Sequence, residues 1–344
     1  MKLLRLAVAA VALLALDAAA AEAQQLQKIS VGLLRLSSSG AVFIAREKGY
    51  FREQGLDADL KIMTAAQQVP VAVTSGDADF GVTGLTAGFF NLAGRGALKI
   101  VGAQSREEKG YQLNAYMVTN KAAEGGFNSL KDFAGKRLAV TTTGSTFHYS
   151  IGILAAKYGF DVKSVTLVPL QSLPNMAAAF KGGQVDATIA PVTVARQLEA
   201  EGAGRIIGWV GDETPWQLGA LFTSPKAIAE RRSTVEKFVR AYAKGAHDYH
   251  VAFNARDMTK PAGAQEVRGP GYDEAIGILA KALEQPAERV RVGLPYVDAE
   301  ARLNVGDVYN QVAFWQSQAL VDRTVDARAI LDLSFVKGHF NVPR

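Results

Sequence analysis

Hydroxyl side chains are concentrated just after one short apolar run in the middle of the chain. The run, residues 138–140, predicts a buried strand, and a helix is expected behind it up to about Tyr158. Unpaired N–H groups and the positive end of the helix dipole make the start of such a helix a receiver of anions. We therefore predict an anion-binding loop, with a simple helix cap as the alternative for Ser145 or Thr146. The hydroxyls of this loop are those of Thr141, Thr142, Thr143, Ser145 and Thr146.

A second cluster of hydroxyls occupies the equivalent place near the start of the chain. Ser37, Ser38 and Ser39 follow a strand predicted over 28–36 and precede a helix predicted over 41–48. In open α/β sheets, ligands bind at the carboxyl ends of the strands. Two such loops on two lobes would face each other across a cleft, which favours a shared ligand over two unrelated helix caps.

Three further side chains are candidates for that cleft. Arg196 follows the predicted loop at Pro191 and could bind a carboxylate or sulfonate in a bidentate pair, or form an ion pair elsewhere. Trp216 could stack on a ring of the ligand or pack in an aromatic core. His148 could contact the ligand and make binding depend on pH, or pack inside the protein.

The chain lacks the usual patterns of a catalytic site. It has no G-x-S-x-G nucleophile motif and no G-x-x-x-x-G-K-[ST] phosphate-binding loop. It contains no cysteine, which excludes disulfides, thiolate zinc sites and cysteine nucleophiles. His247 and His250 are two potential metal ligands without a third. We therefore predict no metal, no cofactor and no enzymatic activity.

The first 23 residues have the composition of a secretory signal peptide. Lys2 and Arg5 precede an apolar run over 6–16, and small residues lead to a cleavage site between Ala23 and Gln24. The apolar run is shorter than the ~20 residues that span a membrane. We therefore expect a periplasmic protein, and the lack of cysteine leaves no site for a lipid anchor. The net charge of +5 comes from scattered basic residues, which disfavours nucleic acid as a partner.

Strands and helices alternate along most of the mature chain. The order strand, hydroxyl loop, helix, strand occurs twice, and the short links predict mostly parallel sheets. The chain is too long for one hydrophobic core, so two domains are expected. We predict an α/β fold of two lobes, with mixed, mostly parallel sheets flanked by helices and a ligand cleft between the lobes. The predicted divisions are a signal peptide over 1–23, a first lobe formed by 24–118 with 222–344, and a second lobe over 119–221.

Four segments of the chain resemble a known family in order and spacing. They are GAVFIAREKGYFREQGLDADL (40–60), SGDADFGVTGLT (75–86), SLKDFAGKRLAVTTTGSTFHY (129–149) and GGQVDATIAP (182–191). Together they resemble the substrate-binding proteins of sulfonate, nitrate and taurine type that serve ABC importers. The resemblance implies a type II periplasmic binding protein, a monomer whose two lobes close over a solute.

The resemblance also implies where the ligand lies, namely between the loops at the strand ends of both lobes. It further implies a membrane permease with a cytoplasmic ATPase as partner. The absence of cysteine disfavours the branch of the family that binds thiamine pyrimidine precursors. The function we predict is capture of a small organic anion, a sulfonate or carboxylate that can be aromatic; the alternatives are an exported enzyme on the same fold and a receptor that signals ligand occupancy. Carried onto this chain, the binding loops contain Ser37, Ser38, Ser39, Gly84, Leu85, Thr86, Thr141 to Thr146, Pro191 and Val192.

Overall fold

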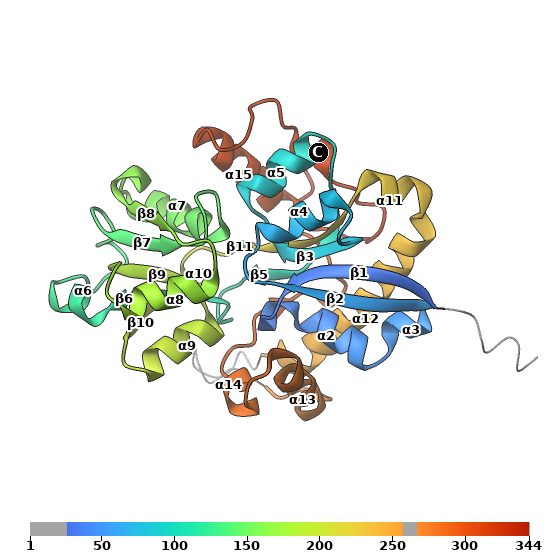
Figure 1. Cartoon of the computed structure of the whole chain (residues 1–344), viewed down its shortest axis with the longest axis horizontal. Coiled ribbons are helices and arrows are strands. Elements are labelled where there is room, and N and C mark those ends of the chain that lie inside the picture. The colour runs from blue at the N-terminus through green and yellow to red at the C-terminus, as the bar shows by residue number, and fades with distance from the viewer. Residues whose placement is uncertain (1–25, 257–266, 344) are drawn as a thin grey trace, which may run out of the picture.

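The computed structural model describes residues 26–256 and 267–343. Two five-stranded sheets form the centres of two lobes that lie side by side in Figure 1. The predicted signal peptide over 1–23 lies outside the described residues. No helix of the described part is long and apolar enough to cross a membrane.

The sheet of the first lobe has the strand order β2-β1-β3-β12-β4. β1 is parallel to both β2 and β3, whereas β12 is antiparallel to β3 and β4. The second half of β1 is buried on both faces, as expected for a central strand that helices cover on either side. The strands are β1 (Gln27–Leu34), β2 (Leu56–Met63), β3 (Phe80–Gly84), β4 (Lys99–Ala103) and β12 (Gly219–Thr223).

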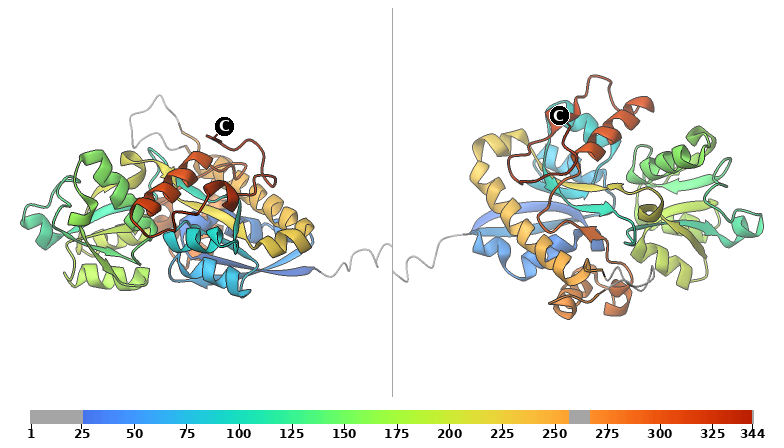
Figure 2. Two further views of the ribbon diagram at one scale, coloured as in Figure 1. Left: turned by 90° about the horizontal axis from the view of Figure 1, so that it is seen from above. Right: turned by 180° about the vertical axis from the view of Figure 1, so that it is seen from behind.

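Helices cover both faces of this first sheet. The longest, α12 (Arg232–Phe253), crosses the back of the lobe in the right-hand view of Figure 2. It buries an apolar stripe at helical spacing, and the ring of its Phe238 stacks on Phe80 of β3 at 3.9 Å between centroids. The other helices here are α2 (Gly40–Glu47), α3 (Tyr50–Glu53), α4 (Gln68–Ser75), α5 (Ala87–Gly94), α11 (Pro225–Glu230), α13 (Tyr272–Leu283) and α14 (Ala287–Arg291).

The second lobe is built on the strand order β10-β6-β9-β7-β8. β7 is parallel to β8 and β9, and β6 is antiparallel to β9 and β10. Its strands are β6 (Asn114–Thr119), β7 (Arg137–Val140), β8 (Thr166–Pro169), β9 (Ala187–Pro191) and β10 (Gly204–Trp209). Its helices are α6 (Asn120–Glu124), α7 (Thr146–Tyr158), α8 (Leu173–Lys181), α9 (Val192–Ala200) and α10 (Val210–Glu213). The predicted fold class, two α/β lobes with mixed sheets flanked by helices, is confirmed.

A small three-stranded sheet lies between the two larger ones (Figure 1). It is formed by β5 (Ser105–Glu107), β11 (Trp216–Gln217) and β13 (Tyr296–Val297), and β5 and β11 belong to the two stretches of chain that join the lobes. The buried Gln217 fastens this region. Its Nε2 donates to the carbonyls of Ser105 and Gly219, and its own carbonyl accepts from Gln311 of α15 (Val305–Ser317).

The chain crosses between lobes at places that differ from the predicted boundaries. Residues up to 118 were assigned to the first lobe, but β6 is hydrogen-bonded within the second sheet. The second lobe was expected to extend to 221, but β12 pairs within the first sheet from Gly219 onward. All of β6 is buried, so its composition fits the core of either lobe, and the polar stretch after it only resembles a linker.

Candidate functional site

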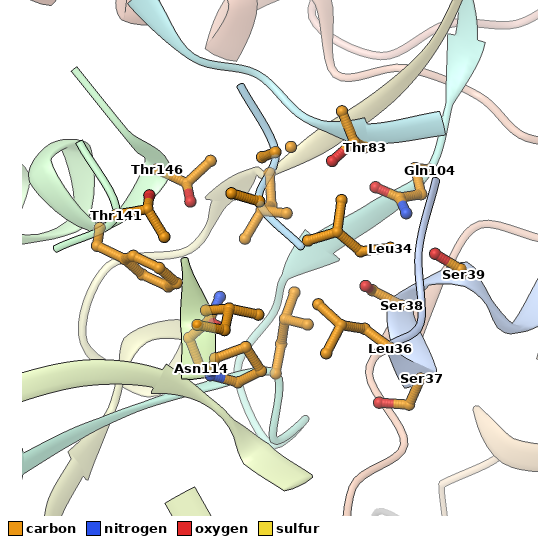
Figure 3. Close-up of a pocket in the computed structure, with 18 residues that line it drawn as sticks. Leu34, Leu36, Ser37, Ser38, Ser39, Thr83, Gln104, Asn114, Thr141 and Thr146 are labelled. Atoms are coloured by element: carbon orange, nitrogen blue, oxygen red, sulfur yellow. The ribbon is translucent and has the colours of Figure 1, made fainter. Parts of the chain in front are cut away.

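A cavity lies where the carboxyl ends of the strands of both lobes face each other (Figure 3). The first lobe contributes the end of β1, the loop after it and the end of β3, and the second lobe contributes the ends of β7 and β9. The lining residues are Leu34, Leu36, Ser37, Ser38, Ser39, Ala65, Ala66, Thr83, Gly84, Gln104, Leu113, Asn114, Thr141, Thr146, Phe147, Leu173, Pro191 and Leu218. Its volume is about 50 Å³ in this arrangement of the lobes.

The wall from the first lobe carries three consecutive serines. Ser37–Ser39 form a single 3-10 turn that runs directly into α2, and all three are buried. Within the described part of the chain, the Ser39 Oγ has no hydrogen-bond partner although it is buried. Gly40 is required behind this turn, because a Cβ there would lie 2.6 Å from the Tyr249 ring. The serines are therefore held firmly with at least one hydroxyl left for a ligand.

The wall from the second lobe consists of the strand end of β7 and the first turn of α7. Figure 3 shows Thr141 and Thr146 across the cavity from the serine turn. The N–H groups of Thr146 and Phe147 open α7, so neither has an acceptor inside the helix, and both residues line the cavity. The positive end of the α7 dipole therefore points to the cavity from this side.

His148 holds the loop between β7 and α7 in place. Gly144 has a φ of +86°, and its N–H donates to the His148 Nδ1 at 3.1 Å. The imidazole packs edge-on against Trp315, with centroids 5.3 Å apart. Burial lowers the pKa of His148 to about 4, so the ring is neutral at physiological pH and Nδ1 accepts. His148 thus packs behind the cavity and does not line it. This is the alternative to ligand contact that the sequence left open for it.

Among the described residues that line the cavity, none carries a formal charge. Glu107 of β5 lies behind the lining, and its Oε1 accepts from the Asn114 Nδ2 at 2.6 Å. Glu107 is fully buried, and burial raises its pKa to about 8. The cavity therefore recognises its ligand through neutral hydroxyl, amide and backbone groups, between apolar side chains.

Seven of the predicted site residues line the cavity. They are Ser37, Ser38, Ser39, Gly84, Thr141, Thr146 and Pro191. Their contact with a ligand stays a prediction, although the structure brings them together from two lobes and four separate segments.

The other six predicted loop residues do not reach the cavity. The hydroxyls of Thr86 and Ser145 cap helices, since they accept from the N–H groups of Phe89 and His148. Thr143 is exposed. The rest lie outside the lining: Leu85, Thr142 and Val192. Ser145 therefore caps the helix, which is the alternative to ligand binding that the sequence left open for it.

Arg196 and Trp216 are also removed from the cavity. The Arg196 guanidinium forms an ion pair with Glu199 at 2.9 Å and lies over the Trp209 ring. Trp216 packs in the core against Tyr149, with ring centroids 4.6 Å apart. Both side chains therefore follow the structural alternative given for them, and the basic group expected in the cleft is absent from the described lining residues.

Several polar residues of the cavity are not among those predicted from the sequence, namely Thr83, Gln104 and Asn114. Thr83 lies inside a buried strand, and Gln104 follows the last residue of β4. Asn114 opens β6, the strand that was assigned to the wrong lobe. All three could have been predicted from one pattern, a polar residue at or near the end of an apolar strand.

The two lobes touch each other around the cavity. The Ala87 N–H at the start of α5 donates to the Gly144 carbonyl at 2.8 Å. The Gln67 Nε2 also donates to the Gln171 carbonyl of the other lobe at 3.1 Å. A wider groove of about 650 Å³ adjoins the cavity and shares Leu34, Leu36 and Leu173 with it. The structure thus has the lobes in direct contact at two places. In residues 26–256 and 267–343, no three His, Asp or Glu side chains gather as a metal site would require.

Residues 37–252, more than half of the chain, match the family described as NMT1/THI5 like. The chain belongs to this family. A curated relative from Brucella abortus is 28% identical over 145 residues, a segment that spans 42% of this chain and 41% of the relative.

Several solved structures have the same fold as this chain. The alkanesulfonate-binding protein SsuA from Xanthomonas axonopodis pv. citri, bound to MOPS, superposes with a TM-score of 0.71 at 18% identity, over 89% of this chain and 98% of that one. The periplasmic nitrate-binding protein NrtA from Synechocystis PCC 6803 superposes with a TM-score of 0.69 at 13% identity, over 89% and 85%. At these identities the likeness establishes the periplasmic binding protein fold, and the resemblance read from the sequence is confirmed.

Proposed function

We propose that this protein is the periplasmic solute-binding component of an ABC importer and that it captures a small organic anion, a sulfonate or a carboxylate. The observation that carries the proposal is the cavity itself, which takes hydroxyl groups from both lobes at the strand ends. The NMT1/THI5-like family and the fold shared with sulfonate-binding and nitrate-binding proteins support it.

Neutral groups hold the anion in this proposal. The hydroxyls of the serine turn donate from one side, and those of Thr141 and Thr146 donate from the other, together with the opening N–H groups of α7. A helix N-terminus stabilises a negative charge by roughly 0.3–1 kcal/mol, and more where solvent is excluded. Leu34, Leu36 and Phe147 then cover the apolar part of the solute.

Closure of the lobes captures the solute. The contact between Ala87 and Gly144 joins the lobes beside the cavity, and the contact between Gln67 and Gln171 joins them at a second place. Opening breaks these few contacts and flexes the strands next to Gln217. The closed surface is then recognised by a membrane permease with its ATPase. The alternative of an enzyme lacks support, because the described lining residues include no acid, base or charged side chain.

A thermal-shift screen of residues 24–344 tests the ligand class. The panel contains ethanesulfonate, 2-hydroxyethanesulfonate, benzoate, 4-aminobenzoate and nitrate. We expect at least one sulfonate or carboxylate to raise the Tm by several degrees, since a ligand at 100 times its Kd adds about 2.7 kcal/mol. If no member of the panel stabilises the protein, the proposed ligand class is wrong. Fractionation of cells that express the full chain tests the periplasmic location.

A further inference from the structure

The side chain of Asn114 connects the cavity to a buried carboxyl group. Asn114 lines the cavity, and its Nδ2 donates to the Glu107 Oε1 at 2.6 Å. Glu107 lies on β5 next to the crossing between the lobes and is 0% exposed. It does not line the cavity itself, and Asn114 is the lining residue to which its side chain is hydrogen-bonded.

The Oε1 of Glu107 acts as the acceptor. The raised pKa keeps the carboxyl group mostly protonated at neutral pH, and the Oε2, which has no hydrogen-bond partner among the described residues, is left to carry the proton. Besides the Asn114 side chain, the backbone N–H groups of Asn114 and Gly211 face it. All of these are donors. An Asn amide can present either its NH₂ or its oxygen to a partner, and the hydrogen-bond network decides which. Glu107 therefore holds the NH₂ of Asn114, and the Oδ1 of Asn114 remains for the cavity.

We propose that Glu107 is a positioning residue that fixes the Asn114 amide with its oxygen toward the cavity and thereby selects organic acids that also carry an N–H or O–H donor. This inference rests on the proposed function and specifies its substrate class. The acid group is held by the hydroxyls and by the α7 N-terminus, and the donor of the solute binds the Asn114 Oδ1.

Two further lining residues favour a solute with polar groups of its own. The Gln104 Oε1 and the Ser39 Oγ are buried, and among the described residues neither has a hydrogen-bond partner. Gln104 is 2% exposed and Ser39 is 1% exposed. Figure 3 shows both side chains at the cavity, on the first-lobe side. A buried acceptor without a partner costs about 1–3 kcal/mol, and a donor on the ligand would remove that cost.

Matched pairs of acids measure the selectivity without a change of charge. The pairs are 2-hydroxyethanesulfonate with ethanesulfonate, and 4-aminobenzoate with benzoate. Calorimetry gives the ratio of the two Kd values for each pair. We expect the wild-type protein to bind the donor-bearing member of at least one pair roughly tenfold more tightly.

Glu107→Gln is the decisive variant because it keeps the shape of the side chain and changes its hydrogen-bonding options. The Gln NH₂ can donate to the Asn114 Oδ1, which lets the Asn114 NH₂ turn to the cavity. We expect the Kd ratio to fall to about one or to invert, while the member without a donor still binds. A merely structural role of Glu107 would weaken both members alike and leave the ratio unchanged, and that result overturns the inference.

Asn114→Leu gives a second test should Glu107→Gln fail to fold. It removes the amide and should abolish the preference within each pair, so a preference that survives in it also overturns the inference. Wild-type protein that binds both members of every pair equally overturns the inference and leaves the proposed function standing. Wild-type protein that binds neither acid of any pair overturns the proposed ligand class, and the inference with it.

Discussion

His148 shows how one buried side chain can set the shape of a loop that it does not belong to. Its neutral ring accepts the Gly144 N–H and packs against aromatic rings of α15. Because the pKa of His148 lies at about 4, protonation is costly in the folded protein and easy in the unfolded chain, where the value is about 6.5. The contribution of His148 to stability is complete above pH 6.5 and declines as the pH falls toward 4.

This linkage predicts a specific pH dependence. Between pH 7 and pH 5 the wild-type protein should lose about 2 kcal/mol of unfolding free energy that His148→Gln does not lose, because Gln can accept the Gly144 N–H without titrating. Urea unfolding of both proteins at the two pH values gives the difference, and other titrating groups cancel in it. Equal losses in both proteins would show that folding leaves the pKa of His148 unchanged.

The role of the Thr141 hydroxyl in ligand binding can be tested with an isosteric variant and a matched control. Thr141→Val keeps the shape and removes the hydroxyl, so we expect binding of the best acid from the panel to weaken roughly five- to tenfold. Thr143→Val is the matched control, since Thr143 is exposed two residues away and outside the lining. An equal loss in the control would mean that the loop, and not the cavity hydroxyl, determines affinity.

At the scale of elements, the contact between α5 and the loop before α7 determines how closely the lobes approach. Gly144 has a positive φ, and a Cβ there would lie 2.8 Å from the Cβ of Ala87. Gly144→Ala should therefore weaken ligand binding roughly tenfold because the closed form becomes overpacked. Calorimetry with the panel acid measures the change.

Gly159 provides the control for that substitution. It ends α7 with a φ of +77°, and no atom lies within 4 Å of a Cβ placed there. Gly144→Ala and Gly159→Ala should each cost about 1–2 kcal/mol of stability, since alanine is strained in the left-handed region. Only the first should change affinity. Weaker binding in both variants would trace the effect to general destabilisation.

The connection between lobes depends on an amide network that reaches into α15. Gln311 is fully buried, and its Nε2 donates to the Gln217 carbonyl at 2.8 Å. Gln311→Leu leaves that carbonyl unpaired, so we expect a loss of about 1–3 kcal/mol in urea unfolding. Asn310→Leu, at an exposed position of the same helix, should change stability by less than about 0.5 kcal/mol. Comparable losses would show that the network adds no stability.

The elements themselves were largely predictable from the sequence, and their assignment to lobes was not. Apolar runs and helix-stop glycines placed most strands and helices, including the serine turn before α2 and the threonine loop before α7. A fully buried strand such as β6 carries no local mark of the sheet that it joins. Serine and threonine serve both as helix caps and as ligand-binding residues. Only the structure shows that Ser145 caps α7 whereas Thr146 lines the cavity.

On the scale of the whole molecule, the C-terminal helix α15 also connects the lobes, because it packs against α7 of the second lobe. α15 follows the first lobe in the chain, yet its Phe314 ring touches α7 so closely that a Cβ on Gly152 would lie 2.2 Å from it. Phe314 and Trp315 also pack on Tyr149. The cavity itself is lined by residues far apart in sequence, such as Ser39 and Thr141, and no local pattern specifies how two lobes will meet.

The contact of Gln67 with Gln171 has a practical consequence. The two residues belong to different lobes, and the chain contains no cysteine. Two cysteines introduced at these positions would be the only thiols available for coupling a donor and an acceptor dye. The proposed closure of the lobes over a solute would then change the energy transfer between the dyes. The labelled protein could therefore be used to screen a chemical library for its ligand.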